Sequence, residues 1–265
     1  MTLDDLYSVI VAKIFADKYR EGATEVAFSR DEMLKAADDL DLERPKNVGD
    51  VAYSFRFRRQ LPASITSTAP EGKEWIISGR GRSKYAFELA TISRVRPNLN
   101  LVDTKIPDAT PEIVLQYSQS DEQALLAKIR YNRLLDIFLG VTTYSLQNHL
   151  RTTVPEIGQL EIDEVYVGVN TRGAHFIIPV QAKTGTDQIG IVQIRQDLAW
   201  CRSRFPEQDA RPVAAQSMSD DRIALFELTE DGGEMRIVDE RHYRLVHRDD
   251  ISAEDLLRYK PTSPQ

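Results

Sequence analysis

Two stretches of alternating side chains, joined by a very short loop, place the strongest constraint on the fold of this chain. Residues Gln159–Val169 and His175–Lys183 are rich in valine, isoleucine and aromatic residues, as half-buried β-strands are. The loop contains Thr171-Arg172-Gly173, and glycine suits the left-handed position that a three-residue hairpin loop requires. The sequence therefore predicts an antiparallel hairpin with a defined register.

In that register four polar side chains share one face of the hairpin. Asp163 is expected opposite Gln181, and Glu161 opposite Lys183, with Cβ atoms about 5 Å apart in each pair. Burying such groups costs free energy unless a partner satisfies them, and a hard divalent cation is the simplest partner. The Asp163 carboxylate, the Gln181 amide and the Ala182 carbonyl offer the oxygen ligands that Mg²⁺ takes. Lys183 is then placed to orient or deprotonate a water, or to stabilise a phosphorane.

The hairpin lies within a regular order of helices and strands. Ser120-Asp-Glu-Gln123 is a capping box that opens a helix, and Gly140 is a typical residue to end it. A second helix is expected over Asp187–Phe205. The remaining strands are expected at Thr142–Val154, Arg211–Met218, Arg222–Thr229 and Met235–Val246. This αβββαβ order predicts a mixed sheet flanked by helices.

Asp163 followed by Gln181-Ala182-Lys183, in this order of elements, resembles the PD-(D/E)xK nuclease superfamily, in the QxK form of Mrr-type restriction enzymes. The resemblance covers residues 120–218. It implies that Asp163 binds the metal, that Gln181 stands where the second, usually acidic, ligand does, and that Lys183 is catalytic. It also implies Mg²⁺ as the cofactor and hydrolysis of a phosphodiester bond to leave a 5′-phosphate.

Three further residues are candidates for the same site. Superfamily members often place a glutamate early in the preceding helix, where this chain has Glu122. They often present glutamine from the following helix, where it has Gln193 and Gln196. Each has a simpler interpretation, because Glu122 neighbours a capping box and the glutamines fit the polar face of an amphipathic helix.

The chain also departs from the superfamily pattern. No proline precedes Asp163, and Gln181 lacks the usual negative charge, which leaves open whether one or two ions bind. Glu161, on the same face, is the residue that would compensate. In the alternative interpretation, Glu161 and Lys183 form a cross-strand salt bridge on a solvated sheet face.

Residues 1–100 are predicted to form a separate domain of three helices and a hairpin. The helices are expected over Leu3–Tyr19, from the capping box at Ser29–Glu32 to about Leu40, and over Gly49–Leu61. Strands at Trp75–Ser78 and Tyr85–Leu89 flank a basic loop. In outline this resembles a winged-helix DNA-binding domain.

The charge distribution agrees with a polyanion partner for this domain. The chain carries a net charge of −7, yet residues 44–96 hold eleven basic and four acidic residues, a net +7 against −14 elsewhere. The candidate DNA contacts are Arg56, Arg58, Arg59, Arg80, Arg82 and Lys84. The simpler interpretation is a solvated helix face, with Phe55 and Phe57 in the core.

Other features narrow the classes of protein. A single cysteine, Cys201, excludes a disulfide scaffold and fits a reducing compartment, and the four histidines lack zinc-binding spacing. No phosphate-binding loop for a nucleotide cofactor is present in the sequence. The start of the chain shows no signal peptide, and no apolar run is long enough to span a membrane.

Together these features predict an α+β protein of two domains. A winged-helix-like domain (1–100) is followed by a linker (101–119) and a restriction-endonuclease-like domain (120–265). The expected function is that of a cytoplasmic, Mg²⁺-dependent restriction-type endonuclease that cuts double-stranded DNA as a homodimer. A modification-dependent or repair nuclease, and a non-catalytic DNA-binding protein with a degenerate nuclease domain, are the alternatives.

Overall fold

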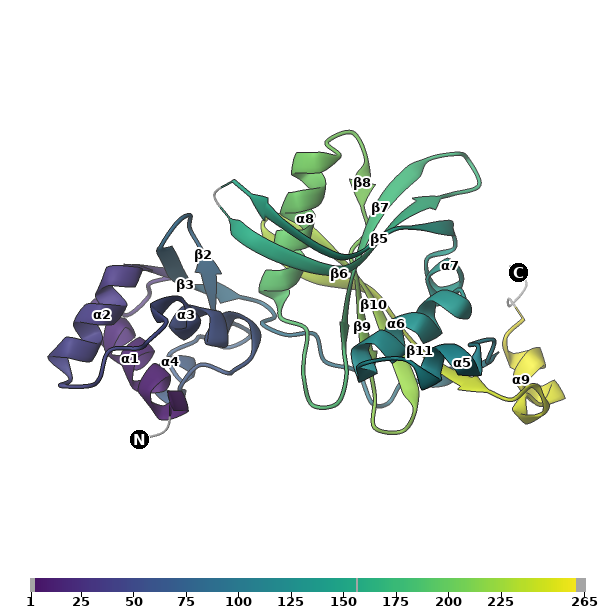
Figure 1. Cartoon of the computed structure of the whole chain (residues 1–265), viewed down its shortest axis with the longest axis horizontal. Helices are drawn as coiled ribbons and strands as arrows, with labels where there is room; N and C mark the ends of the chain where they lie inside the picture. The colour runs from purple at the N-terminus through teal and green to yellow at the C-terminus, as the bar shows by residue number, and fades with distance from the viewer. Residues whose placement is uncertain (1–2, 156, 261–265) are drawn as a thin grey trace.

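The computed structural model describes residues 3–155 and 157–260, which form an α+β fold of two units. Figure 1 shows the N-terminal unit at one end of the molecule and the C-terminal helix α9 (Ala253–Arg258) at the other. Within the described ranges no helix is long and apolar enough to cross a membrane.

The N-terminal unit packs its helices against a three-stranded antiparallel sheet in the order β1-β3-β2. Ser29 and Glu32 form the predicted capping box of the second helix, and Asn47 caps the third. The short strand β1 was not predicted, because only its Val26 and Phe28 are apolar and buried. The elements are α1 (Leu3–Lys18), β1 (Glu25–Ser29), α2 (Arg30–Asp39), α3 (Val48–Phe57), α4 (Ala63–Thr66), β2 (Glu74–Gly79) and β3 (Lys84–Ala90).

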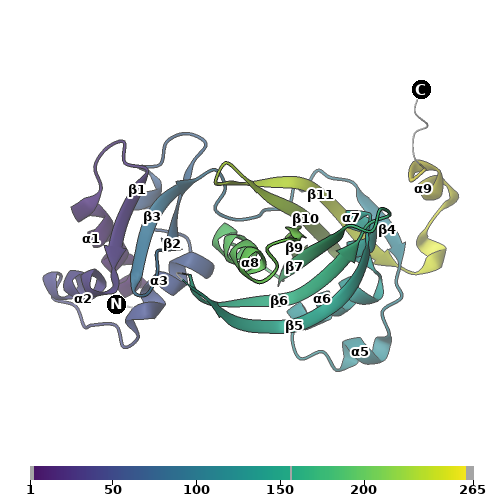
Figure 2. The ribbon, with the colours of Figure 1, turned by 90° about the horizontal axis from the view of Figure 1, so that it is seen from above.

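The C-terminal unit is built on an eight-stranded mixed sheet with the strand order β4-β11-β10-β9-β7-β6-β5, in which β8 pairs with β7. Helices α6 and α7 cover one face of the sheet and α8 (Ile191–Arg204) covers the other (Figure 2). The predicted strands are confirmed within two residues at each end. They are β5 (Thr142–Val154), β6 (Gly158–Val169), β7 (His175–Lys183), β9 (Val213–Ser217), β10 (Arg222–Asp231) and β11 (Glu234–Val246). The two-residue strand β8 (Asp209–Ala210) was not predicted.

The helix predicted from Ser120 to Gly140 is two helices, α6 (Asp121–Tyr131) and α7 (Leu134–Leu139). The break lies at Arg133, whose backbone is left-handed with φ of 50°. The buried Asn132 side chain stabilises it by donating to the Thr110 hydroxyl at 2.8 Å and accepting from the Ala109 N–H at 2.7 Å. Apolar periodicity does not reveal such a break, because the stripe continues on both sides of it.

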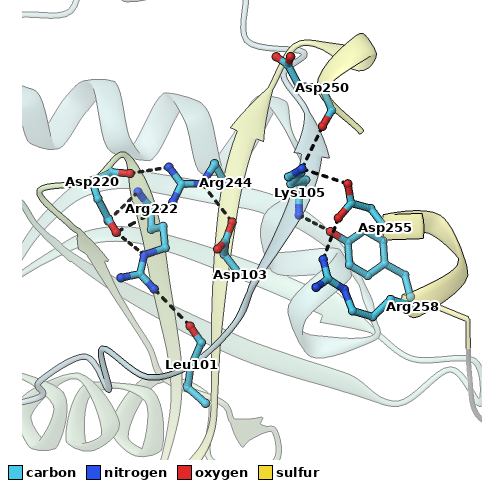
Figure 3. A network of polar contacts seen from close by, with 10 residues as sticks. Leu101, Asp103, Lys105, Asp220, Arg222, Arg244, Asp250, Asp255 and Arg258 are labelled. Atoms are coloured by element: carbon cyan, nitrogen blue, oxygen red, sulfur yellow. Dashed lines mark hydrogen bonds and ion pairs between the residues drawn. The ribbon is translucent and has the colours of Figure 1, made fainter. Parts of the chain in front are cut away.

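The segment predicted as a linker is part of the C-terminal unit. Its strand β4 (Asp103–Pro107) pairs in parallel with β11 at the sheet edge, and α5 (Glu112–Gln116) follows. Polar contacts fix this strand (Figure 3): Arg244 donates to Asp103 at 3.0 Å, and Lys105 donates to Asp255 of α9 at 3.0 Å. The strand lacked a recognisable pattern because it is short and only partly buried, and backbone pairing and ion pairs hold it at the sheet edge.

The two units share a hydrophobic cluster. Ile76, Ala90 and Val95 of the N-terminal half are buried in one cluster with Ile191 and Phe226. The backbone around Arg94 forms an antiparallel bridge with Gly190, in which the Val95 N–H donates to the Ile189 carbonyl at 2.9 Å. The units are therefore docked on each other rather than tethered by a free linker.

An ion pair between the two units predicts that the folded protein loses stability at acidic pH. Glu234 accepts from the Lys73 ammonium at 2.7 Å and from Thr91, and these contacts lower the pKa of Glu234 to about 2. A lowered pKa in the folded state stabilises the protein above the unfolded pKa of about 4.3, and this gain is lost as pH falls toward 2. We expect the melting temperature of wild type to fall faster between pH 4.5 and 2 than that of Glu234→Gln. Equal slopes would contradict this role.

Candidate active site

The candidate site lies where β6 and β7 separate. Their pairing has the predicted register from Val169 opposite His175 to Glu164 opposite Val180. Beyond that pair β7 no longer pairs with β6, while its other edge remains paired with β9, where Gln181 lies beside Ala214. The predicted ladder pairs of Asp163 with Gln181 and of Glu161 with Lys183 are therefore wrong.

An irregularity in the neighbouring strand accompanies the separation. The register between β5 and β6 shifts between Ser145 and Gln147, and His149 takes a left-handed φ of 48°. A bulge of this kind bends a strand and ends its regular pairing, and such bulges are frequent beside active sites. The loop residues that fixed the hairpin register carry no information about this distant bend.

Side chains bridge the gap between the separated strands. The Asp163 Oδ2 accepts from the Ala182 N–H at 2.8 Å, and the Gln181 Nε2 donates to the Glu161 carbonyl at 2.9 Å. In a regular antiparallel ladder, backbone groups of the two strands would bond directly to each other without side chains. The gap between the separated strands is a wedge that these two bonds span, and they fix the side chains that line it.

The charged residues of the wedge form different pairs from those expected. The Lys183 Nζ donates to the Glu122 Oε1 of α6 at 2.7 Å, while Glu161 pairs with Arg151 of β5 at 3.2 Å. The alternative of a Glu161–Lys183 salt bridge is therefore wrong. Glu122, which is distant in sequence, is brought directly to the candidate catalytic lysine.

Burial and the neighbouring charges all shift the pKa of Asp163, and they do not all shift it in the same direction. Burial raises the pKa of this carboxyl most strongly, and the negative charge of Glu122 raises it further. The Ala182 N–H and the Lys183 ammonium lower it, without cancelling the effect of burial. A cation bound between Asp163 and Glu122 would favour the ionised form of both.

Asp197 of α8 is the site residue that the sequence analysis missed. Its carboxylate accepts from the Gln181 Nε2 at 3.1 and 3.2 Å and is only 1% exposed. Burial raises the pKa of Asp197 well above its usual range, and the Asp163 charge adds to the effect. Asp197 lies three residues after Ile194 and four before Cys201, so a carboxylate on the apolar stripe of the helix was the available signal.

The glutamines of α8 have different roles. Gln193 accepts from the Gly190 N–H at 3.2 Å through its Oε1 and so caps its own helix. Gln196 is buried and faces the cavity. Gln193 therefore has a structural role in its helix, although its side chain also lines the cavity.

A cavity of about 480 Å³ joins these residues to the N-terminal unit. Tyr53 and Phe57 of α3 form its wall on that side. The candidate residues that line it are Glu122, Glu161, Asp163, Gln181, Lys183, Gln193 and Gln196. Ala182 is fully buried beneath it. The cavity therefore brings α3 and the QxK strand to one cleft.

The residues present suit one Mg²⁺ ion better than two. In the described part of the chain no group of three or more histidine, cysteine, aspartate or glutamate side chains is placed to hold a metal. Mg²⁺ commonly takes one or two carboxylates and completes its shell with water and substrate phosphate. Asp163 and Glu122 supply that number, whereas Glu161 is bound to Arg151 and the Gln181 nitrogen faces Asp197.

The candidate DNA contacts divide into three groups. Arg59 pairs with Asp4 at 3.2 Å, and Arg80 pairs with Glu88 and with Glu25 at 2.8 Å, so acids of their own unit already neutralise them. Arg56 is largely buried and stacks on Phe57. Among the described residues no carboxylate pairs with the exposed Arg58, Arg82 and Lys84.

We compared the chain with protein-family models, curated proteins and solved structures. None of these comparisons gives a significant match.

Proposed function

We propose that the chain is a Mg²⁺-dependent endonuclease of the PD-(D/E)xK type that acts on double-stranded DNA. The observation that carries the proposal is the contact of Lys183 with Glu122 beside the half-buried Asp163, in a cleft that α3 also lines. Two carboxylates and a lysine, gathered from three separate elements, suit the hydrolysis of a phosphodiester. The αβββαβ order and the QxK sequence support the same assignment.

Each residue has a distinct part in this chemistry. Asp163 and Glu122 would hold the ion, and Gln181 and Asp197 keep the strand carrying Lys183 in place. When bound, Mg²⁺ supplies positive charge at the phosphate and makes its water more acidic. The Lys183 ammonium orients the attacking water and stabilises charge on the phosphate oxygens. The oxygen of this water bonds to phosphorus as the water loses a proton to solvent, and the bond to the 3′-oxygen breaks as that oxygen takes a proton from solvent. The products are a 5′-phosphate and a 3′-hydroxyl.

The N-terminal unit would hold the duplex. Helices α1–α3 with the three-stranded sheet, and the one-turn α4 in addition, fit a winged-helix domain, in which α3 and the β2–β3 loop contact DNA. Arg58 lies at the end of α3, and Arg82 and Lys84 lie at the loop. We further propose a cytoplasmic homodimer, because cutting both strands needs two copies of the site.

Plasmid cleavage with Mg²⁺ tests the proposal, with Asp163→Asn as the matched variant. Asparagine keeps an oxygen to accept from the Ala182 N–H, so the wedge is retained while the charge is lost. We expect wild type to cut supercoiled plasmid with Mg²⁺ and not with EDTA, and Asp163→Asn to be slower by about 10²- to 10³-fold. Equal cleavage by both proteins would contradict the assignment.

One observation favours a second candidate, a DNA-binding protein without catalysis. Gln181 stands where the resemblance expects a second acidic ligand, and its nitrogen donates to Asp197 and to the Glu161 carbonyl, so this position adds no negative charge to the site. This candidate predicts DNA binding with no cleavage of any substrate and no Mg²⁺ uptake by calorimetry. Within the nuclease class, parallel digestion of methylated and unmethylated DNA separates a modification-dependent or repair enzyme from one that cuts unmodified sites.

A further inference from the structure

A second cavity, of about 450 Å³, lies beside the first. The two share Tyr53 and Phe57 of α3 on one side, and Lys183 and Gln193 on the other. They are therefore neighbouring parts of one cleft that passes Lys183. The second part also contains Arg58 and Arg94, and no residue that binds metal in the proposed mechanism.

Arg94 is a half-buried cation without an acidic partner. Its guanidinium donates to the Arg59 carbonyl at 2.9 Å and to the Gln188 carbonyl at 3.4 Å, and no carboxylate of the described ranges lies within ion-pair distance. Burial lowers the pKa of this guanidinium, and the Arg96 charge lowers it further. Arginine carries five N–H donors, so most of them remain free for an anion in the cavity.

Arg58 points a second guanidinium into the same space. It lies over the Tyr53 ring, with its central carbon 5.0 Å from the ring centre, and this stacking restricts the orientation of its planar group. The acid that lines the cavity is Asp187, which forms no ion pair with either arginine. Lys183 is already paired with Glu122, so Arg58 and Arg94 face the single carboxylate of this cavity, and the cavity favours an anion.

We propose that Arg94 and Arg58 form a phosphate-binding subsite that holds a phosphate of the bound strand next to the one that is cleaved. A guanidinium with several free donors binds phosphate with paired hydrogen bonds, which fixes the register of the strand as well as its affinity. The inference rests on the proposed nuclease function for the identity of the strand. It assigns to Arg94 a role that charge counting did not distinguish from that of Arg96.

The salt dependence of DNA binding without metal tests the subsite. The probe is a fluorescein-labelled 30-base-pair duplex in EDTA, bound by wild type, Arg94→Gln and the matched control Arg96→Gln. Arg96 lies two residues away, is exposed and is 4.0 Å from Glu74. One phosphate contact contributes about 0.9 to the slope of log K against log salt, so we expect Arg94→Gln to lose about 0.9 and Arg96→Gln none. Arg58→Gln should also lose about 0.9, and it leaves the contacts of Arg94 between the units intact.

A substrate modification locates the contact. A neutral methylphosphonate placed at each position of the duplex in turn should weaken wild-type binding at one position and have no further effect there in Arg94→Gln. The subsite would be overturned if both Arg94→Gln and Arg58→Gln kept the wild-type slope of log K against log salt. It would also be overturned if Arg96→Gln lost as much of this slope as Arg94→Gln. Because cleavage is not needed for this measurement, a protein that binds with these slopes but never cuts contradicts the nuclease function and leaves the subsite standing.

Discussion

Gln181→Glu is expected to destabilise the protein, although it restores the acidic residue usual in PD-(D/E)xK nucleases. The Gln181 nitrogen donates to the Asp197 carboxylate at 3.1 and 3.2 Å, and both side chains are buried. A glutamate there would place two carboxylates together without a donor, at a cost of about 3 kcal/mol in the free energy of unfolding at pH 7. Chemical denaturation of both proteins measures the difference.

The pH dependence and a second substitution separate charge repulsion from poor packing. The new carboxyl would have a raised pKa in the folded state, so its destabilising effect should be small below pH 4 and grow as pH rises above the unfolded pKa of about 4.3. Adding Asp197→Asn supplies an amide donor to the glutamate and should recover most of the loss. A pH-independent loss that Asp197→Asn does not relieve would contradict the proposed pairing.

Lys183→Met is expected to lower the rate of DNA cleavage by about 10³-fold while leaving DNA affinity within about twofold. Methionine keeps the length of the aliphatic stem and removes the ammonium that contacts Glu122. Single-turnover cleavage with Mg²⁺, together with binding in EDTA, measures the two effects separately. The control is Lys128→Met on α6, which does not line the cavity.

The pH profile gives Lys183 a second test. The Lys183 charge lowers the pKa of Asp163, so its removal should raise that pKa and move the acidic limb of the residual activity to higher pH. A rate within threefold of wild type, or a loss matched by Lys128→Met, would argue against a catalytic role for Lys183.

Local sequence signals predicted the strands and the hairpin register, because turn chemistry and alternation act over a few residues. The register holds from Val169 to Glu164 and then fails at Asp163, where a bend originating in β5 separates the strands. A bulge in a neighbouring strand is a tertiary effect, and the hairpin sequence does not encode it. The pairing of Lys183 with Glu122 could not be predicted either, because it also depends on the tertiary structure.

For the basic segment, too, the sequence predicted the composition but not the contacts of the individual residues. Counting charges identified residues 44–96 as cationic, and the count is correct. It did not show that Asp4 and Glu88 would neutralise Arg59 and Arg80, or that Arg94 would lie in the cleft without an acid. Ion pairing depends on distances between elements that are remote in sequence, whereas composition averages over them.

The bridge between Arg94 and Gly190 gives the two units a mechanical connection. Residues 184–190 run from the end of the strand that carries Lys183 to this bridge, so a short tether joins the candidate catalytic lysine to the N-terminal unit. A shift of the N-terminal unit at this bridge would therefore reach the strand that carries Lys183. By thermodynamic reciprocity, a ligand that fixes Lys183 would equally bias the orientation of the N-terminal unit.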